Sequence, residues 1–554
     1  MVYILAMFTL LQLQAQINPG ADFDLQNYID KKISAGETNI TIQPGKYRVK
    51  PTNGVHLSFK NLKGITIDAT GVEMICTETT RAVTIDNCQN LTIKGLTVDY
   101  DPLPFTQGRI VSISEDKMTH IIELFDGYPT DGIITCSKYE IFKPDTHTLR
   151  FGSYYNGKIE RLPSGNLKYT KAEQYTTRSA PERVGDLIVT NFTTNYNDRA
   201  SHAIYIQNST KTVLNSVTLF GANSFGFLEN GCNGSVYRNC VVDRRPLSTD
   251  IKKRAYKRLR SLNADAFHSK HAEVGPAYLN CTARFQGDDC FAINGDFHMV
   301  VKSNGNLIRV LAKRNELGIR KGDTIQIVNR NGYRLPNNVV KSVREVGLTT
   351  SDEREKIANT QIHNRFKNTN SFFNRAYEIK LKDTVSLEFA SAVCSANRIG
   401  NGFRVIGCIL GFNRSRGILV KAGNGLIQGN HIDSCWMQSI KVTPEFNWME
   451  AGCSKNVTIK DNVINNSGAN AISVVSKTRD GIISPPGIHQ NIIISDNTIY
   501  NSPSPQILVT STNGLSVLKN KIEVESEKDK KNAIQITESI NTKMSGNKIR
   551  RTVK

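Results

Sequence analysis

Residues 455–468, KNVTIKDNVINNSG, contain a phrase that recurs along the chain. In its inner part apolar or β-branched residues alternate with polar ones, which is typical of a strand, and Asn or Gly stands at its ends, where tight turns need positive φ. Related phrases are NLKGITIDATG (61–71), NCQNLTIKGLTVDY (87–100), HQNIIISDNTIYNS (489–502) and TNGLSVLKNKIE (512–523). Recurrence at roughly 20–35 residues indicates a solenoid. We therefore predict an all-β fold, a right-handed parallel β-helix whose stacked coils bury one continuous core.

Two stretches, 104–185 and 301–390, lack the recurring phrase. They contain alternating segments such as HIIELF and KGDTIQIVN, which are typical of antiparallel strands. We interpret them as two inserted β-barrel-like domains, which often wall a substrate groove. The segment 24–34, DLQNYIDKKIS, has apolar residues on one helical face and is expected to cap the first coil. The remaining predicted units are a signal peptide (1–16), a cap with the first coils (17–103), central coils (186–300) and C-terminal coils (391–554).

The composition is that of a folded, strongly basic chain of 554 residues, with 39% hydrophobic residues and a formal net charge of +20. This charge favours association with polyanions such as sulfated or uronic polysaccharides. The first stretch, MVYILAMFTLLQLQAQ, fits the apolar core of a secretory signal, and no other segment approaches the length of a membrane span. We expect a secreted, periplasmic or cell-surface protein without a membrane span, and the long exposed face of a β-helix is compatible with a homodimer.

The segments NADAFHS (263–269) and QGDDCFAING (286–295) contain the candidate catalytic residues Asp265, Asp288 and Asp289. Asp265 and Asp288 are 23 residues apart (288 − 265), close to one coil. Stacked strands lie about 4.8 Å apart, so the three carboxyl groups would crowd together. Like charges held close raise at least one pKa, so that one group can act as acid and another as base. We predict a glycoside hydrolase, in which Asp288 or Asp289 is the acid and Asp265 with the other aspartate is the base.

Further polar residues lie on neighbouring coils and are predicted to bind substrate: Asn263, His268, His202, Glu229, Asn294, Arg416 and Lys421. The 11 cysteines stand singly, without zinc-binding spacing, and are expected to be buried thiols. We expect no metal and no cofactor. The basic run DIKKRAYKRLR (250–260) either recruits sulfated galactans or forms a solvated loop. Nucleic acid is not expected as a partner, because no binding fold or aromatic platform accompanies the charge.

The pattern Asn-x-Asp followed one coil later by Gly-Asp-Asp resembles that of the polygalacturonases of glycoside hydrolase family 28, but the Gly-His-Gly of that family is absent. A longer resemblance, over most of the chain, is to the α-1,3-galactosidases of glycoside hydrolase family 110. It is carried by TVDYDPLPFTQGRIVSI (97–113), NADAFHS, GDDCFAING (287–295) and SRGILVKAGNGLIQGN (415–430).

The family-110 resemblance implies a parallel β-helix with inserted β-barrel domains. It also implies exo-acting, inverting, metal-independent release of terminal α-1,3-linked galactose, with Asp265, Asp288 and Asp289 as the catalytic carboxylates. After GDD that family usually continues with Ile-Asn-(Val)-His-Gly, whereas this chain has CFAINGDFH, a departure that bears on the sugar recognised.

Two alternatives remain open. One is a β-helix hydrolase of an anionic galactan, either sulfated or uronic, which the net charge favours. The other is a non-catalytic carbohydrate-binding β-helix protein, which would have no need of three aspartates on adjacent coils. In every case the predicted partner is a glycan.

Overall fold

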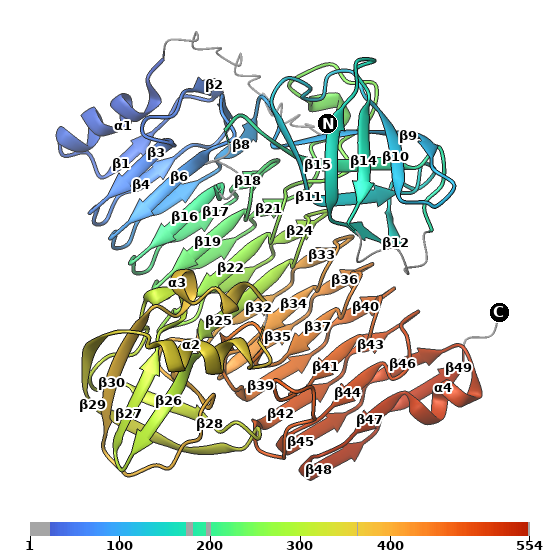
Figure 1. Cartoon of the computed structure of the whole chain (residues 1–554). Helices are drawn as coiled ribbons and strands as arrows, with labels where there is room; N and C mark the ends of the chain where they lie inside the picture. Colours follow the sequence, from blue (N-terminus) through green and yellow to red (C-terminus); the bar gives the residue numbers. More distant parts are fainter. Residues whose placement is uncertain (1–22, 173–180, 196–200, 363, 552–554) are drawn as a thin grey trace, which may run out of the picture.

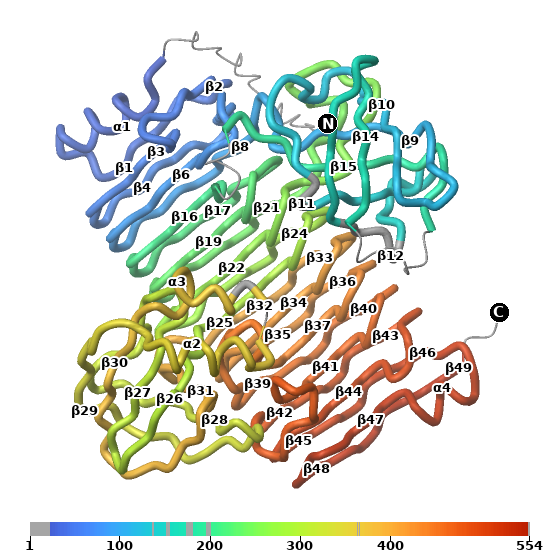
Figure 2. The backbone as a smooth tube through the Cα atoms, in the orientation of Figure 1, coloured from blue at the N-terminus to red at the C-terminus, as the bar shows by residue number. Residues whose placement is uncertain are grey.

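Three long parallel sheets, wound as successive coils, make up most of the molecule (Figure 1). The computed structural model describes residues 23–172, 181–195, 201–362 and 364–551. The smooth tube in Figure 2 shows the coils stacking in chain order from the N-terminal to the C-terminal end, with two further units at the side of the stack. The prediction of a parallel β-helix with two insertions is confirmed.

The strands of the three sheets recur in the same order in each coil, from sheet B to sheet A to sheet C. Sheet B contains β1 (Asn39–Thr41), β4 (Thr66–Asp68), β7 (Thr92–Lys94), β17 (Val213–Asn215), β20 (Val236–Arg238), β23 (Ala277–Leu279), β32 (Arg404–Ile406), β35 (Gly425–Gln428), β39 (Lys455–Lys460), β42 (His489–Ser495), β45 (Thr512–Leu518) and β48 (Ile540–Ser545). Sheet A contains β2 (Gly45–Val49), β5 (Val72–Cys76), β8 (Thr97–Tyr100), β18 (Thr218–Leu219), β21 (Val241–Val242), β24 (Thr282–Arg284), β33 (Ile409–Gly411), β36 (His431–Asp433), β40 (Val463–Asn465), β43 (Thr498–Ile499), β46 (Lys521–Val524) and β49 (Lys548–Arg551). Sheet C contains β3 (Val55–Lys60), β6 (Arg81–Asp86), β16 (Ile204–Gln207), β19 (Phe227–Asn230), β22 (Phe267–Lys270), β25 (Phe291–Asp296), β34 (Ile418–Val420), β37 (Ile440–Val442), β41 (Ile472–Val474), β44 (Ile507–Val509) and β47 (Ile534–Ile536), with β38 (Glu450–Ala451) paired to β25.

The core is one continuous column of inward-facing apolar side chains from Leu25 to Ala533. Its parallel register places equivalent positions of successive coils in line, so Phe267 lies between Phe227 and Phe291 with ring centroids 4.6 and 4.9 Å apart. No coil could bury these rings alone, because each sheet has only one apolar face. The ten described cysteines are all buried and free, as predicted.

Asparagine occurs in the recurring phrase for two structural reasons. Some asparagines, such as Asn456 and Asn491, adopt positive φ at the turns, as predicted. Others form a buried ladder in which each side-chain amide donates to the next amide oxygen at 2.8–2.9 Å; these are Asn430, Asn462, Asn497, Asn520 and Asn547. The ladder satisfies polar groups in turns that would otherwise be buried without partners.

Replacing Asn462 with alanine is expected to destabilise the β-helix by about 2–4 kcal/mol, since it leaves several buried donors and acceptors unpaired. Its amide donates to Ile427 and Asn497 and its oxygen accepts from Asn430. Asn465→Ala, in the same coil but half-buried, is the matched control. Thermal unfolding should show a clearly lower midpoint for Asn462→Ala alone; equal midpoints would contradict a stabilising ladder.

The first insertion is a seven-stranded antiparallel sheet between β8 and β16. Its strands are β9 (Phe105–Ile113), β10 (Thr119–Leu124), β11 (Ile133–Phe142), β12 (Leu149–Tyr155), β13 (Gly157–Arg161), β14 (Leu167–Lys171) and β15 (Leu187–Thr193). Because β15 pairs with both β9 and β11, the insertion runs past residue 185, the boundary expected from sequence.

The second insertion, between β25 and β32, is a closed barrel. Its strands are β26 (His298–Asn304), β27 (Leu307–Leu311), β28 (Thr324–Val328), β29 (Arg334–Leu348), β30 (Arg375–Leu381) and β31 (Ala392–Ser395). It also carries the helices α2 (Ser351–Ala358) and α3 (Thr369–Phe372). The strands therefore extend a few residues beyond the expected range of 301–390 at both ends.

Short helices lie at the two ends of the stack. The helix α1 (Leu25–Ser34) packs Leu25 and Ile29 onto the first coil, as the apolar face of 24–34 predicts, and α4 (Glu527–Asn532) contacts β46 and β49. Among the described residues, no helix is long and apolar enough to cross a membrane. The predicted signal peptide (1–16) lies outside the described residues.

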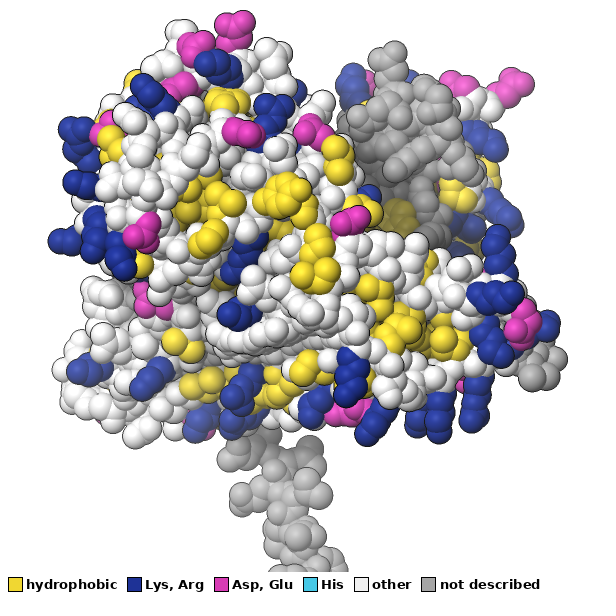
Figure 3. All heavy atoms as spheres, turned by 90° about the horizontal axis from the view of Figure 1, so that it is seen from below, with side chains coloured by type: hydrophobic (Ala, Val, Ile, Leu, Met, Phe, Trp, Pro, Cys, Tyr) yellow, Lys and Arg dark blue, Asp and Glu magenta, His cyan; other side chains and the backbone are white. Residues whose placement is uncertain are grey.

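Part of the net positive charge lies on the outer surface of the β-helix. Figure 3 shows Lys and Arg side chains projecting along the lower edge of the molecule. On the last coils Lys455, Lys521, Lys543 and Lys548 are all exposed. This charge is separate from the carboxylate cluster on the central coils.

Candidate active site

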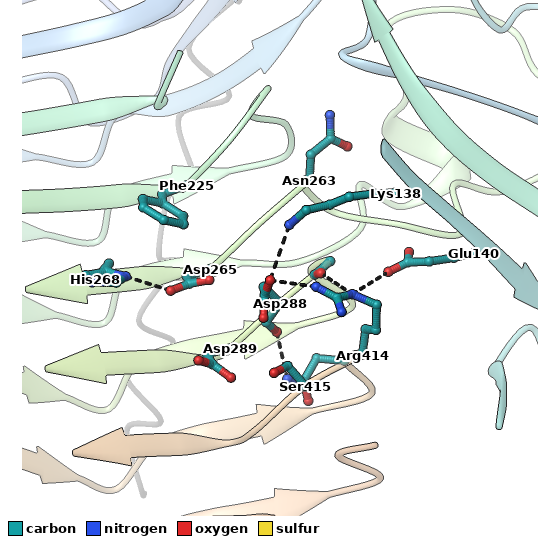
Figure 4. Close-up of polar contacts among 12 residues, drawn as sticks. Lys138, Glu140, Phe225, Asn263, Asp265, His268, Asp288, Asp289, Arg414 and Ser415 are labelled. Atoms are coloured by element: carbon teal, nitrogen blue, oxygen red, sulfur yellow. Dashed lines mark hydrogen bonds and ion pairs between the residues drawn. The ribbon is translucent and has the colours of Figure 1, made fainter. Parts of the chain in front are cut away.

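The three predicted aspartates come together at the start of two adjacent strands of sheet C. Asp265 lies in the loop before β22, and Asp288 and Asp289 lie in the loop before β25. Since β22 and β25 pair in parallel, the two loops stack. One oxygen of each carboxyl group lies within 4.8 Å of the others. Figure 4 shows this cluster with β11 of the first insertion beside it.

Arg416 binds both carboxyl oxygens of Asp289. Its Nε donates to Oδ1 and its Nη2 to Oδ2, both at 2.8 Å, and its backbone N–H adds a third bond to Oδ1. A bidentate guanidinium contact of this kind is among the strongest that a carboxylate makes. Both oxygens of Asp289 therefore accept from Arg416, while one oxygen of each of the three carboxyl groups lies close enough to share a metal ion, so the expectation of no metal stays a prediction.

Asp288 is held ionised by cationic side chains from two other parts of the chain. The Nη2 of Arg414 lies 2.6 Å and the Nζ of Lys138 lies 3.4 Å from its Oδ2. Burial opposes ionisation, but Arg414, Lys138 and Arg416 outweigh it and hold the pKa of Asp288 below its usual range. Sequence reasoning missed both Lys138 and Arg414. The first has no signal in the sequence, whereas the second stands directly before the SRG motif.

Asp265 behaves differently, because burial raises its pKa to about 6 against the opposing effect of His268. Its Oδ2 lies 2.7 Å from Nδ1 of His268, whose Nε2 lies 2.9 Å from Oδ1 of Asn294. The Nδ2 of Asn294 donates to Gly295, so its Oδ1 faces the ring as an acceptor. The Nε2 of His268 then donates to Asn294, which leaves its Nδ1 facing Oδ2 of Asp265.

Asn294 therefore positions the proton of Asp265 through His268. Asn294→Ala is expected to lower kcat/KM roughly ten- to a hundredfold and to shift its pH profile, because the ring can then adopt the other tautomer. Asn230→Ala, two coils earlier in the same row and bonded to His271, is the control. An unchanged pH profile in Asn294→Ala would contradict this positioning role.

Two predicted substrate-binding residues lie beside Asp265. The rings of His202, Phe225 and His268 stack face to face with centroids 4.9 Å apart at each step. Burial lowers the pKa of His202 to about 3, so its ring is neutral at ordinary pH. The stack holds His268 from the side opposite to Asn294. The substrate contacts of His202 and His268 stay predictions.

The other predicted binding residues have structural partners. Glu229 points into the core, where it accepts from Ser269 and Tyr237, and this placement contradicts a substrate contact. Lys421 is fully buried between Glu445 and Glu450, each at 2.9 Å, which also contradicts one. Inward and outward positions alternate along a strand, and the sequence alone did not establish which face Glu229 occupies.

Asn263 joins the site to the first insertion. Its Nδ2 donates to the carbonyl oxygen of Pro104 at 2.7 Å, and its Oδ1 accepts from Arg260 at 2.9 Å. With 1% of its surface exposed, Asn263 positions the loop of Asp265. Its substrate contact stays a prediction.

Neither interpretation of the basic run 250–260 is correct for its arginines. Arg254, Arg258 and Arg260 are buried. Arg258 pairs with Asp99 and Asp250, and Arg260 pairs with Glu140 of β11. The run is therefore an internal joint between the β-helix and the first insertion, because Asp99 and Glu140, both distant in the sequence, and Asp250 within the run neutralise its arginines.

Comparison with known proteins adds only distant likenesses. No family model matches the chain, and no curated protein matches it. Among solved structures, it is similar to the A-module of a mannuronan C-5 epimerase from Azotobacter vinelandii (TM-score 0.40, 11% identity, 95% of this chain and 94% of that chain). It is also similar to a family 28 exopolygalacturonase from Yersinia enterocolitica (0.37, 9%, 93% and 72%) and an endo-xylogalacturonan hydrolase from Aspergillus tubingensis (0.36, 8%, 97% and 92%). Likenesses at this level carry no conclusion about the activity of this chain.

Proposed function

We propose that the protein is a glycoside hydrolase that uses the carboxylate cluster as acid and base. One observation carries the proposal: a buried carboxyl group with a raised pKa, Asp265, lies within 4.8 Å of Asp288, whose pKa neighbouring cations lower. Glycosidic hydrolysis needs such a pair, one group protonated and the other not. A protein that only binds glycans does not need one protonated and one ionised carboxyl group side by side.

The environments of the three groups support the following roles. Asp265 donates its proton to the leaving glycosidic oxygen as the bond to the anomeric carbon breaks. Asp288 takes a proton from water as the hydroxyl adds to that carbon, because its side chain is 28% exposed whereas that of Asp289 is 4% exposed. Asp289 positions Arg416. This order reverses the hypothesis from sequence, in which Asp265 belonged to the base.

A neutral galactoside is the substrate we propose, with terminal α-1,3-linked galactose as its most specific form. Support comes from the family-110 resemblance and from the pairing of the cations at the site. Lys138, Arg414 and Arg416 all bind carboxylates of the cluster, so they do not form an unpaired cationic patch for a sulfate or uronate. The inverting outcome rests on the resemblance alone. Inverting enzymes usually separate their carboxyl groups by about 6.5–9.5 Å, so the anomer of the first product is an outcome of the test.

The test is incubation with galactose-α-1,3-galactose, the fucosylated blood-group B trisaccharide and a sulfated galactan, with released sugar followed by NMR. The proposal predicts galactose from a neutral substrate; the β-anomer appearing first would indicate inversion and the α-anomer retention. Release from the sulfated galactan alone would favour the anionic-polymer hydrolase. If none of the three were cleaved while all bound, the binding-protein alternative would stand.

The pH dependence follows from the raised pKa of Asp265. A general acid must be protonated, so kcat/KM is expected to stay level below pH 6 and to fall about tenfold per pH unit above it. The lowered pKa of Asp288 keeps the base ionised on the acid side of this range. A kcat/KM that increased through pH 6 would exclude Asp265 as the acid. The profile should be measured by initial rates on the best neutral substrate.

A further inference from the structure

A groove lies beside the carboxylate cluster, between the first insertion and the later coils of the β-helix. Its volume is about 630 Å³, within the range of about 300–1,000 Å³ typical of ligand sites. One wall comes from residues 143–149, which follow β11, and the other from the loops that lead from sheet A to sheet C. Its lining includes Phe412, Asn413, Trp436, Asn466, Ser502 and Gln506.

Both walls continue elements of the active site. Asn413 directly precedes Arg414, and its Nδ2 donates to the backbone oxygen of Asp288 at 2.8 Å. On the other wall, Lys143 is three residues from Glu140, whose Oε1 lies 3.5 Å from Nε of Arg414. Asn413, which lines the groove, is therefore the sequence neighbour of Arg414, which contacts Asp288.

The side chains of the groove are mostly amides, hydroxyls and aromatic rings. Its charged residues are Lys143, Glu525 and Asp529, so it has no cationic cluster for a polyanion. Two lining side chains are nearly fully buried, Asn413 at 2% and Gln506 at 1% exposed. Within the described ranges, Oδ1 of Asn413 and Oε1 of Gln506 have no hydrogen-bond partner. A buried acceptor without a donor is unfavourable, and a ligand hydroxyl can relieve it after a small rotation of the amide.

We infer that this groove binds a segment of neutral glycan chain next to the cleaved bond. Sugars present hydroxyl donors to the amide oxygens and apolar ring faces to aromatic side chains such as Trp436. The choice of a glycan over another neutral polyol rests on the proposed function. The groove and its unpaired acceptors are observed independently of that function. The substrate is then an oligosaccharide or polysaccharide chain longer than a disaccharide, despite the basic composition of the protein.

The chain has two tryptophans, Trp436 in the groove and Trp448 outside it, which makes fluorescence a direct test. In an Asp265→Asn background, where turnover is blocked, Trp448→Phe leaves Trp436 as the sole tryptophan. Titration with a galactotetraose should change its emission saturably, with affinity at least tenfold higher than for galactose. The matched Trp436→Phe protein, which reports from Trp448, should show no saturable change.

A second variant tests the acceptors themselves. Gln506→Leu in the Asp265→Asn, Trp448→Phe background should weaken binding of the galactotetraose about five- to tenfold, with a cooperative thermal unfolding transition as the check on folding. An emission of Trp436 that does not respond, or responds equally to galactose, would overturn the inference. If the wild-type protein cleaves galactosides while the emission of Trp436 does not change, the groove inference fails and the proposed function stands. If the emission of Trp436 responds in a protein that cleaves no glycan, the groove inference stands and the proposed function fails.

Discussion

Asp265→Asn is expected to lower kcat roughly a thousandfold or more on unactivated glycosides, within the range that general acid catalysis contributes. Asparagine keeps the shape of the side chain and its contact with His268, but it has no proton to give to the leaving oxygen. The folded state should be at least as stable as the wild type, because burial already disfavours the charged form of this carboxyl group. Initial rates and thermal unfolding midpoints measure the two effects separately.

The leaving group distinguishes an acid from a base in the same experiment. A nitrophenyl galactoside needs little protonation, so Asp265→Asn should recover much of its rate on that substrate, whereas Asp288→Asn should stay inactive on both. Asp461→Asn, an exposed aspartate at a turn of a later coil, controls for the change in net charge. Equal losses on both substrates for Asp265→Asn would refute its role as acid.

Arg260→Met should have the largest effect on stability, about 3–5 kcal/mol. The guanidinium is fully buried, and it contacts Glu140 through Nε and Nη2 at 2.8 and 2.6 Å and the backbone oxygen of Lys138 at 2.8 Å. Methionine fills a similar volume but removes the short contacts of Glu140, leaving it with the 3.5 Å contact to Arg414. The midpoint of thermal unfolding should fall sharply, and kcat should fall with it, because β11 carries Lys138 to Asp288.

The double variant Glu140→Gln with Arg260→Met is the sharper form of this test. Replacing the buried Glu140 carboxylate with a neutral amide should restore part of the lost stability, because Glu140 and Arg260 form one ion pair. Lys253→Met, an exposed position in the same basic run, should change stability by no more than about 0.5 kcal/mol. A similar effect of Lys253→Met and Arg260→Met would contradict the internal joint.

Local patterns in the sequence were sufficient to predict the β-helix. The alternation in 455–468 specifies strands with one apolar face, and asparagine at its ends satisfies turns that stack coil on coil. The spacing of Asp265 and Asp288 equals one coil, so their proximity also followed from the sequence. These features depend on residues close together in the chain or related by the repeat.

The features that escaped prediction depend on contacts between distant segments. Lys138 reaches Asp288 from the first insertion, and Asp99 and Glu140, which pair with Arg258 and Arg260, lie far away in the sequence. The order of acid and base depends on burial and on neighbouring guanidinium groups, which a motif does not contain. Glu229 was predicted to bind substrate but points into the core, because the sequence did not establish which face of its short strand it occupies.

Cleavage in water enriched in oxygen-18 tests most directly whether the cluster hydrolyses glycosidic bonds. The account predicts one heavy oxygen at the anomeric carbon of the released galactose for each bond broken, and neither product with label in the Asp265→Asn protein. Cleavage that left the oxygen unlabelled and introduced a double bond into the sugar would indicate elimination. Either that result, or labelled galactose released at the wild-type rate by Asp265→Asn, would contradict the proposed acid and base.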